Sequence, residues 1–407
     1  MRALRGTRTT LSVPLSPRAG RGDAQPPCKS RLAILALAIT PLLAAPSHAQ
    51  TPFQPPTPPT QKIVRLLAFP EYFDPHALEA FEKATGYQVA YDTYSLQLEI
   101  PEKLKQGPYD VVALPGQALI GRIAAGALAK LDKARLPHAR DAQPAVLAKL
   151  AAYDPSAAYS VPFGWAPYGL LYESQKVPPR LGGAPSSWSA LLTPQSVRNL
   201  GPCGAVIPNA RDAMFVATWR LMGLEPWKVG PAQIKFAAAI LAQVKPALQG
   251  FAVADPVGAL ARDSACLTAG TSGEADAANA RAKRMGKPAT IAFVFPREGG
   301  GVSIDSLAVP RDAPNPAVAH QLIDFLLRAD NAAADARAAG LNSSLDGRDL
   351  DLLKRASPIG AWDDRFGAVL EAEWTPLRAG KPPPPLVDKS KADKAKAQAD
   401  KTKRKKH

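Results

Sequence analysis

Short apolar runs alternate with amphipathic segments along residues 62–132. The runs at residues 63–69, 89–91 and 111–114 have the length of buried strands. Helical segments separate them, so the pattern predicts strands that alternate with helices and form a parallel sheet. Parallel sheets bind ligands in the crevice beyond the carboxyl ends of their strands. The residues at two such ends are Phe69, Pro70, Glu71, Tyr72, Pro115, Gly116 and Gln117.

The helix expected after the first strand has clear signals at both ends. Asp74 followed by Pro75 is typical of a helix start, and Gly86 is typical of a helix end. Between them, Leu78 and Phe81 lie on one apolar stripe. The sequence therefore predicts a helix that begins at Pro75 and stops at Gly86.

The same patterns predict the later elements. Residues 159–172 alternate aromatic and small side chains, which favours extended strands that cross out of a first lobe, and residues 307–310 return the chain to it. Helices are expected at residues 121–128, 144–153, 211–222, 231–244, 273–285, 316–328 and 362–374, and short strands at residues 203–207, 265–269 and 291–295. In the amphipathic helix 316–328, the residues expected to be buried are Leu322, Ile323, Phe325, Leu326 and Leu327.

A chain of 407 residues is long enough for two lobes, each with its own core. We expect the first lobe to comprise residues 62–163 and 291–340, and the second to comprise residues 164–290 and 341–380. Residues 50–61 are rich in proline and without periodicity, which predicts an extended linker.

The N-terminal segment has the pattern of a secretory signal peptide. Lys29 and Arg31 precede an apolar run, and Ser47-His48-Ala49 supplies small residues at the positions that a signal peptidase reads. The run is too short for a membrane-spanning anchor. Residues 1–49 are therefore predicted to be removed after Ala49, and the mature protein is expected in the periplasm.

The net charge of +15 resides mostly in the two ends of the chain. Residues 1–49 carry +6 and residues 381–407 carry +7, which leaves +2 for the part between them. A core so close to neutral argues against a nucleic-acid partner. Residues 381–407 have almost no apolar side chains and are predicted to be disordered. They form either a solvated tail or an electrostatic tether to anionic envelope polymers.

Two cysteines, Cys203 and Cys266, remain once the signal peptide is removed. In an exported protein an isolated pair is most simply a disulfide, and two free buried thiols are the alternative. A metal site is disfavoured because the histidines are scattered and show no ligand spacing. No metal or other cofactor is expected.

No catalytic motif is present. The sequence contains no G-x-S-x-G, no H-E-x-x-H and no phosphate-binding G-x-x-x-x-G-K-[ST] loop, and the run of residues 299–301 is expected to be a glycine turn between strands. The protein is therefore not expected to be an enzyme. A secreted hydrolase that uses paired carboxylates is the alternative.

Several segments together resemble one protein family. The segments AFEKATGYQVAYDTY, YDVVALP, LDKARLP and YDPSAAYSVPFGWAPYGLLYESQKV occur in this order. They resemble the periplasmic spermidine- and putrescine-binding proteins of ABC transporters over most of residues 62–375. The resemblance implies an α/β fold of the type II periplasmic binding proteins, in which two lobes with parallel-rich sheets are joined by a hinge of crossing strands.

The resemblance also implies a function and its partners. A small cationic solute would be held between the lobes of a monomer and delivered to an ABC permease in the inner membrane. Cys203 and Cys266 fall where the putrescine-binding members have a disulfide. The alternative is a non-transport envelope binding protein on the same scaffold.

A diamine needs carboxylates for its ammonium groups and aromatic rings for its methylenes. The family's aromatic positions become Phe69, Thr271, Ser303 and Leu341, so most of the rings are lost while the acids remain. Each lost ring removes about 0.5 to 2 kcal/mol of cation–π interaction, which predicts weak diamine binding or a more polar cation. The ligand-binding positions that the resemblance implies are Phe69, Glu71, Tyr72, Gln117, Asn209, Asp212, Thr271, Glu274, Ser303, Asp305 and Leu341.

Overall fold

The computed structural model describes residues 62–95 and 97–379, all within one compact unit. The signal peptide, the linker and the Lys-rich tail expected from the sequence lie outside these residues. Within the described ranges, no helix is both long and apolar enough to cross a membrane. The same ranges contain no group of His, Cys, Asp or Glu residues arranged to hold a metal ion.

The first three strands form the parallel unit that the sequence predicts. β1 (Ile63–Ala68) lies between β2 (Gln88–Thr93) and β3 (Val111–Pro115) and runs parallel to both. Burial of the apolar side chains on both faces of β1 and β3 holds these strands at the centre of the first lobe. The carboxyl ends of β1 and β3 therefore open on the same edge of the sheet.

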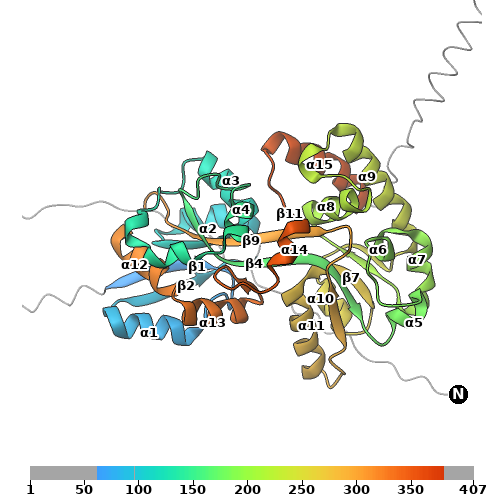
Figure 1. Ribbon diagram of the computed structural model, residues 1–407, viewed down its shortest axis with the longest axis horizontal. Helices are drawn as coiled ribbons and strands as arrows, with labels where there is room; N and C mark the ends of the chain where they lie inside the picture. The colour runs from blue at the N-terminus through green and yellow to red at the C-terminus, as the bar shows by residue number, and fades with distance from the viewer. Residues whose placement is uncertain (1–61, 96, 380–407) are drawn as a thin grey trace, which may run out of the picture. The chain divides into compact units, whose positions relative to one another are not determined.

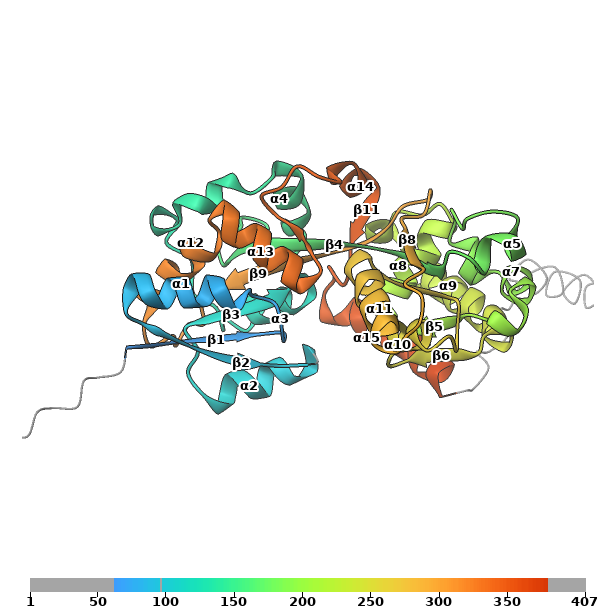
Figure 2. The same ribbon diagram turned by 90° about the horizontal axis from the view of Figure 1, so that it is seen from below.

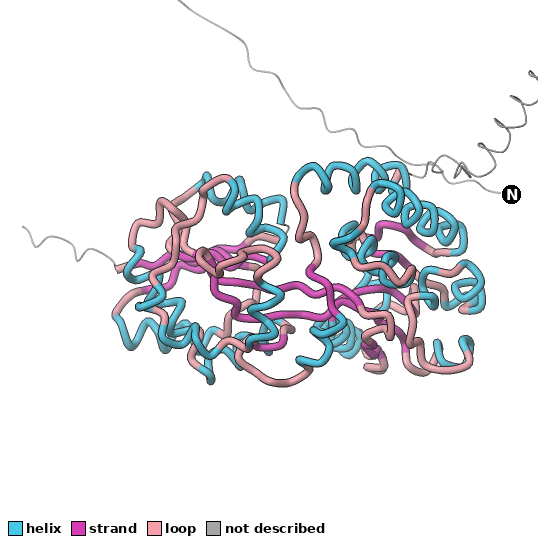
Figure 3. Tube along the Cα trace, turned by 45° about the horizontal axis from the view of Figure 1, so that its top comes forward, coloured by secondary structure: helices cyan, strands magenta, loops and turns pink. Residues whose placement is uncertain are grey.

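Two long strands continue this sheet into the second lobe. β9 (Gly300–Ala308) pairs antiparallel with β3 and with the first part of β4 (Ser160–Glu173). The last residues of β4 pair with β7 (Leu267–Thr271) and β8 (Ile291–Val294). Figures 1 and 2 show β4 and β9 running between the two groups of helices, and Figure 3 shows the continuous strands that result. The crossing expected over residues 159–172 is therefore a single strand, with β9 beside it.

Helices pack on both faces of the first half of the sheet. On one face, Phe81 of α1 and Leu322 of α12 share a core with β1 and β3, and on the other, Leu119 of α3 and Val146 of α4 do the same. The helices of this lobe are α1 (Pro75–Thr85), α2 (Ile100–Gln106), α3 (Gly116–Ala124), α4 (Pro144–Leu150), α12 (Pro316–Leu326), α13 (Ala329–Ala339) and α14 (Leu350–Arg355).

The second lobe has a separate core, which contains the buried indoles of Trp188, Trp219 and Trp374. It also contains a short parallel sheet of β5 (Val206–Pro208) and β6 (Gly250–Val253). The helices of this lobe are α5 (Val177–Leu181), α6 (Ser189–Leu192), α7 (Pro194–Asn199), α8 (Arg211–Leu221), α9 (Pro231–Val244), α10 (Pro256–Ala261), α11 (Ser272–Arg284) and α15 (Asp364–Arg378).

The packing of β8 and α14 indicates the lobe to which each belongs. Ile291 of β8 packs with Leu171 and Leu260 of the second lobe. Leu353 of α14 belongs to a core cluster of the first lobe. The remaining short strands join the crossing: β10 (Asn342–Ser343) pairs with β4, and β11 (Ala356–Pro358) pairs with β9.

The predicted ends of α1 and the predicted buried face of α12 are confirmed. Asp74 caps α1 by accepting a hydrogen bond from the backbone N–H of His76, and Gly86 ends the helix in the left-handed conformation. In the last turns of α12 and at its C-cap, Leu327, all five of the residues expected to be buried are buried: Leu322, Ile323, Phe325, Leu326 and Leu327.

Other boundaries predicted from the sequence are wrong. Cys203 lies in a short 3₁₀ helix, and Gly204, which has a positive φ of 63°, separates it from β5, so the strand begins later than expected. The helix expected at residues 121–128 is α3, which begins directly after Pro115. The glycine run forms a turn only at Gly299, because Gly300 and Gly301 belong to β9, where Gly300 pairs with β11 and Gly301 pairs with both β4 and β11.

The two cysteines form a disulfide between the segments that precede β5 and β7. Cys203 and Cys266 are joined with a Cα–Cα distance of 5.4 Å, and 63 positions separate them in the sequence. The side chain of Cys266 is buried in the core of the second lobe. The bond therefore holds a long loop of this lobe closed.

Replacing both cysteines with alanine is expected to lower the free energy of unfolding by roughly 4 kcal/mol, because a loop of this length gains chain entropy in the unfolded state. Urea unfolding of the oxidised protein, the reduced protein and the double variant would measure the loss. The reduced protein should resemble the variant. Equal midpoints for all three would contradict the structural role.

Candidate ligand-binding pocket

A cavity of about 1100 Å³ lies where the two lobes meet at the crossing strands. Residues after β1 and β3 line it from the first lobe, and residues before α8 and α11 line it from the second. Ten of the eleven residues predicted from the sequence line this pocket, so it is the site that those predictions describe. They are Phe69, Tyr72, Gln117, Asn209, Asp212, Thr271, Glu274, Ser303, Asp305 and Leu341.

Glu71 is the predicted residue that the structure does not bring into the pocket. It is exposed and has a left-handed backbone with φ of 61°, within the turn that follows β1. Its neighbours Phe69 and Tyr72 line the cavity, but Glu71 does not. The turn after β1 therefore directs Phe69 and Tyr72 to the cavity and Glu71 to solvent.

Asp305 is the most deeply buried acid of the pocket, with 3% of its surface exposed. It lies on β9, where it is opposite Pro115 of β3 and Gly164 of β4. Its two oxygens accept hydrogen bonds from the Tyr72 hydroxyl at 2.6 Å and the Ser303 hydroxyl at 2.7 Å. Burial raises the pKa of Asp305, although these two bonds act in the opposite direction.

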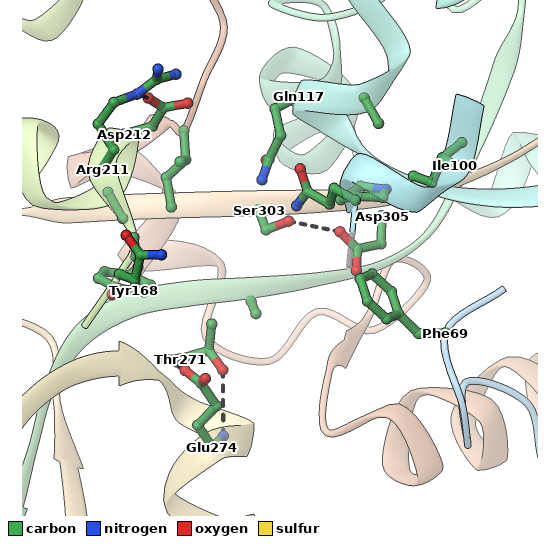
Figure 4. A pocket seen from close by; sticks show the side chains of 18 of the residues that line it. Phe69, Ile100, Gln117, Tyr168, Arg211, Asp212, Thr271, Glu274, Ser303 and Asp305 are labelled. Carbon is green, nitrogen blue, oxygen red and sulfur yellow. Dashed lines mark hydrogen bonds and ion pairs between the residues drawn. The ribbon is translucent and has the colours of Figure 1, made fainter. Parts of the chain in front are cut away.

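Aromatic rings surround Asp305 on the side of the first lobe. The ring centroids of Phe69 and Tyr72 are 5.1 Å apart, and those of Phe69 and Tyr94 are 4.3 Å apart. Burial, followed by the nearby charge of Asp305, raises the pKa of Tyr72 well above its usual value, so its hydroxyl stays protonated and donates. Figure 4 shows Phe69, Asp305 and Ser303 gathered on one side of the cavity.

Thr271 and Glu274 form a capping box at the start of α11. The Thr271 hydroxyl accepts a bond from the Glu274 N–H, and Glu274 Oε2 accepts one from the Thr271 N–H at 2.6 Å. Burial raises the pKa of Glu274, against the effect of these bonds. The pattern T-x-x-E in the sequence is typical of a capping box. Part of the hydrogen-bonding capacity of Glu274 is therefore already used at the start of α11.

Asp212 is paired with a cation from its own chain. Nε of Arg211 donates to Asp212 Oδ1 at 2.6 Å, and Nη1 donates to Glu371 Oε2 at 2.8 Å. Burial lowers the pKa of Arg211, but the two carboxylates outweigh burial and leave the pKa raised. Arg211 and Glu371 also line the pocket and were missed by the sequence analysis, although Arg211 is the direct neighbour of a predicted residue.

Gln117 and Asp212 both lie beside Gly360, which has φ of +71°. A side chain at this position would begin 2.7 Å from Gln117 Cβ and 3.2 Å from Asp212 Oδ2. The amide oxygen of Gln117 is buried and has no hydrogen-bond partner among the described residues. A ligand N–H group is the kind of donor that this oxygen lacks.

The last two predicted residues have different roles. Asn209 Oδ1 accepts a long bond of 3.4 Å from the indole of Trp374. Leu341 packs against Gly164 of β4, where an added Cβ would meet its side chain at 2.6 Å. Leu341 therefore supplies apolar surface to the pocket.

The pocket contains charges of both signs. Four carboxylic acids line it, but three arginines do as well, so the cavity is only weakly acidic. The acids are Asp212, Glu274, Asp305 and Glu371, and the arginines are Arg122, Arg211 and Arg378.

Two lobes joined by continuous strands, with a polar cavity where they meet, define the class of two-lobed solute-binding proteins. The profile described as "Bacterial extracellular solute-binding protein" matches residues 76–351, which is more than half of the chain. The chain therefore belongs to this family of bacterial extracellular solute-binding proteins, which are binding proteins and not enzymes.

Curated relatives agree with the resemblance found in the sequence. The chain is 32% identical to a putrescine/agmatine-binding protein of Pseudomonas aeruginosa over 272 residues, which cover 66% of this chain and 74% of the relative. It is 30% identical to the spermidine/putrescine-binding periplasmic protein of Escherichia coli over 330 residues, which cover 76% and 90%. The predicted family resemblance is confirmed.

Solved structures show the same fold. The spermidine/putrescine ABC transporter substrate-binding protein PotD from Streptococcus pneumoniae superposes with a TM-score of 0.67 at 18% sequence identity. The match covers 78% of this chain and 99% of that protein. The two-lobed α/β fold predicted from the sequence is confirmed.

Asp305→Asn is expected to leave the ligand-free protein as stable as the wild type at neutral pH, or more stable. The raised pKa means that the folded protein keeps this proton at a pH where the unfolded chain, with a pKa near 3.8, has lost it. Wild-type stability therefore falls as pH rises from that value to the folded pKa, and the variant lacks this fall.

Thermal unfolding across this pH range would measure the difference, with the exposed Glu71→Gln as the control. Identical pH profiles for wild type and Asp305→Asn would contradict the burial of a titrating carboxyl group.

Proposed function

We propose that this protein is a periplasmic receptor that binds a small amine, of the putrescine or spermidine type or a related cation, and delivers it to an ABC permease. The observation that carries the proposal is Asp305, a buried carboxylate in a cavity lined by both lobes. The names of the relatives, which include putrescine, agmatine and spermidine, support an amine ligand.

An ammonium group suits the position of Asp305 for two reasons. Each carboxylate oxygen accepts one hydrogen bond from the protein and has capacity for another. A buried carboxylate is costly unless a cation compensates its charge, so an ammonium beside it is stabilised on binding. Phe69 and Tyr72 would cover the methylenes next to that ammonium.

Binding would be coupled to closure of the lobes. A solute that touches Asp305 from the first lobe and Asp212 from the second stabilises the arrangement in which both are in reach. The strands β4 and β9 connect the lobes and would act as the hinge. A permease would then recognise the ligand-loaded arrangement.

We further propose the boundaries of the lobes and the export of the chain. The first lobe would comprise residues 62–163 together with most of β9 and the helices α12 to α14, while β8 would stay with the second lobe because of the packing of Ile291. Export to the periplasm with cleavage after Ala49 fits a family of extracellular binding proteins.

Titration calorimetry with putrescine, cadaverine, spermidine and agmatine tests the amine ligand. Asp305→Asn should weaken binding of any amine that the wild type binds by about tenfold or more, since a charge-assisted hydrogen bond contributes about 1.5–3 kcal/mol. Glu71→Gln removes an acid of the same loop that does not line the pocket, and it should bind as the wild type does.

Equal affinities of the wild type and Asp305→Asn would refute the role of this carboxylate. Failure of the wild type to bind any amine would refute the proposed function and favour a non-transport binding protein on the same scaffold.

A further inference from the structure

Arg211 places a permanent positive charge inside the candidate pocket. It is the first residue of α8, and its side chain is 25% exposed. Nε and Nη1 are held by Asp212 and Glu371, while Nη2 takes part in no hydrogen bond with the residues that the structure describes. The protein thus engages two of the three guanidinium nitrogens, with Nη1 also donating to the Gly367 carbonyl at 3.4 Å, and the N–H groups of Nη2 are left for another acceptor.

This arginine conflicts with a ligand that is positively charged at both ends. A second ammonium near Asp212 would share that carboxylate and Glu371 with Arg211, and it would lie beside a like charge. Asp212 is already paired with a cation, whereas Asp305 has only hydroxyl partners among the side chains that the structure describes. Asp212 is therefore less available than Asp305 to an ammonium group of a diamine. The two sides of the pocket differ in the charge that they favour.

Other groups that line the pocket add positive potential. The helices α3 and α8 both begin at the pocket, and no side chain caps the N–H groups of either first turn. The N-terminus of a helix carries a partial positive charge. Arg122 and Arg378 also line this pocket. Figure 4 shows Arg211 and Asp212 on the side of the cavity away from Asp305 and Phe69.

We propose that the ligand of this pocket carries a carboxylate as well as an ammonium group, and that Arg211 pairs with the carboxylate. This inference rests on the proposed function, in which the ammonium binds at Asp305. Arginine suits the task because its guanidinium stays charged and Nη2 keeps its N–H donors for a carboxylate oxygen. Asp212 and Glu371 hold the guanidinium in position, and the ligand class is therefore an amino-carboxylate.

Calorimetry with matched ligands tests the proposal. Diamines of three to six carbons are each compared with the ω-amino acid of the same length, and putrescine and cadaverine are compared with ornithine and lysine, which add a carboxylate to them. The wild type is expected to bind the best carboxylate-bearing amine about tenfold or more tightly than its matched diamine. The ω-amino acids have a carboxylate in place of the second ammonium, whereas ornithine and lysine have a carboxylate beside it. Comparing the two series shows which arrangement the pocket prefers.

Arg211→Gln should weaken the carboxylate-bearing amines by about tenfold or more and leave the diamines unchanged or tighter. Arg211→Lys keeps the charge without the planar guanidinium that Asp212 and Glu371 hold in position, and it should retain part of the preference. Arg198→Gln is the control, since it removes the same charge from an exposed position of α7 outside the pocket.

Diamines that bind the wild type at least as tightly as their carboxylate counterparts would overturn this inference but not the proposed amine receptor. An equal effect of Arg211→Gln on both series would also overturn it. If that variant does not fold, the comparison of ligands on the wild type decides. Failure of every amine to bind would overturn both proposals.

Discussion

Burial of one carboxylate at the crossing of the two lobes is the constraint on which the candidate site depends. Asp305 lies on β9 between β3 and β4, so the backbone pairing of three strands fixes its position. A charge removed from water needs partners, and the hydroxyls of Tyr72 and Ser303 supply two of them. The turn after β1 is held in place by the same contact, because Tyr72 reaches across to β9. The rings of Phe69 and Tyr72, the turn after β1 and the strand β9 are therefore held together around Asp305.

The other acids of the pocket are less available than Asp305. Glu274 caps α11 together with Thr271, and Asp212 is paired with Arg211. A site that kept all of its acids for ligand cations would be strongly negative, whereas this cavity mixes four acids with three arginines. Electrostatic complementarity determines which partners are rejected more than how tightly any one is bound. Under the proposed function, the arginines would disfavour ligands that are positively charged at both ends.

The parts of the fold that were predictable from sequence are those whose cause is local. Asp74, Pro75 and Gly86 mark the ends of α1 because capping and left-handed backbone act within a few residues. The burial of Leu322 and Leu326 follows from helical periodicity in the same way. The boundaries that were wrong depended on distant partners, as at Gly301, which became part of a strand because β4 and β11 lie on either side of it.

By itself, the sequence determined the alternating α/β pattern through its periodicity. It also determined the family resemblance, because the family's motifs occur in the same order along the chain, and that resemblance implied ten of the residues that line the cavity. Only the tertiary structure decided how those residues are used. It turned Glu71 to solvent, engaged Glu274 in a helix cap, and brought Glu371 of α15 to Arg211 across 160 positions. The physical reason is that hydrogen bonds and charge pairs act through space over a few ångströms. The character of a pocket is therefore set by contacts between segments that are far apart in the sequence.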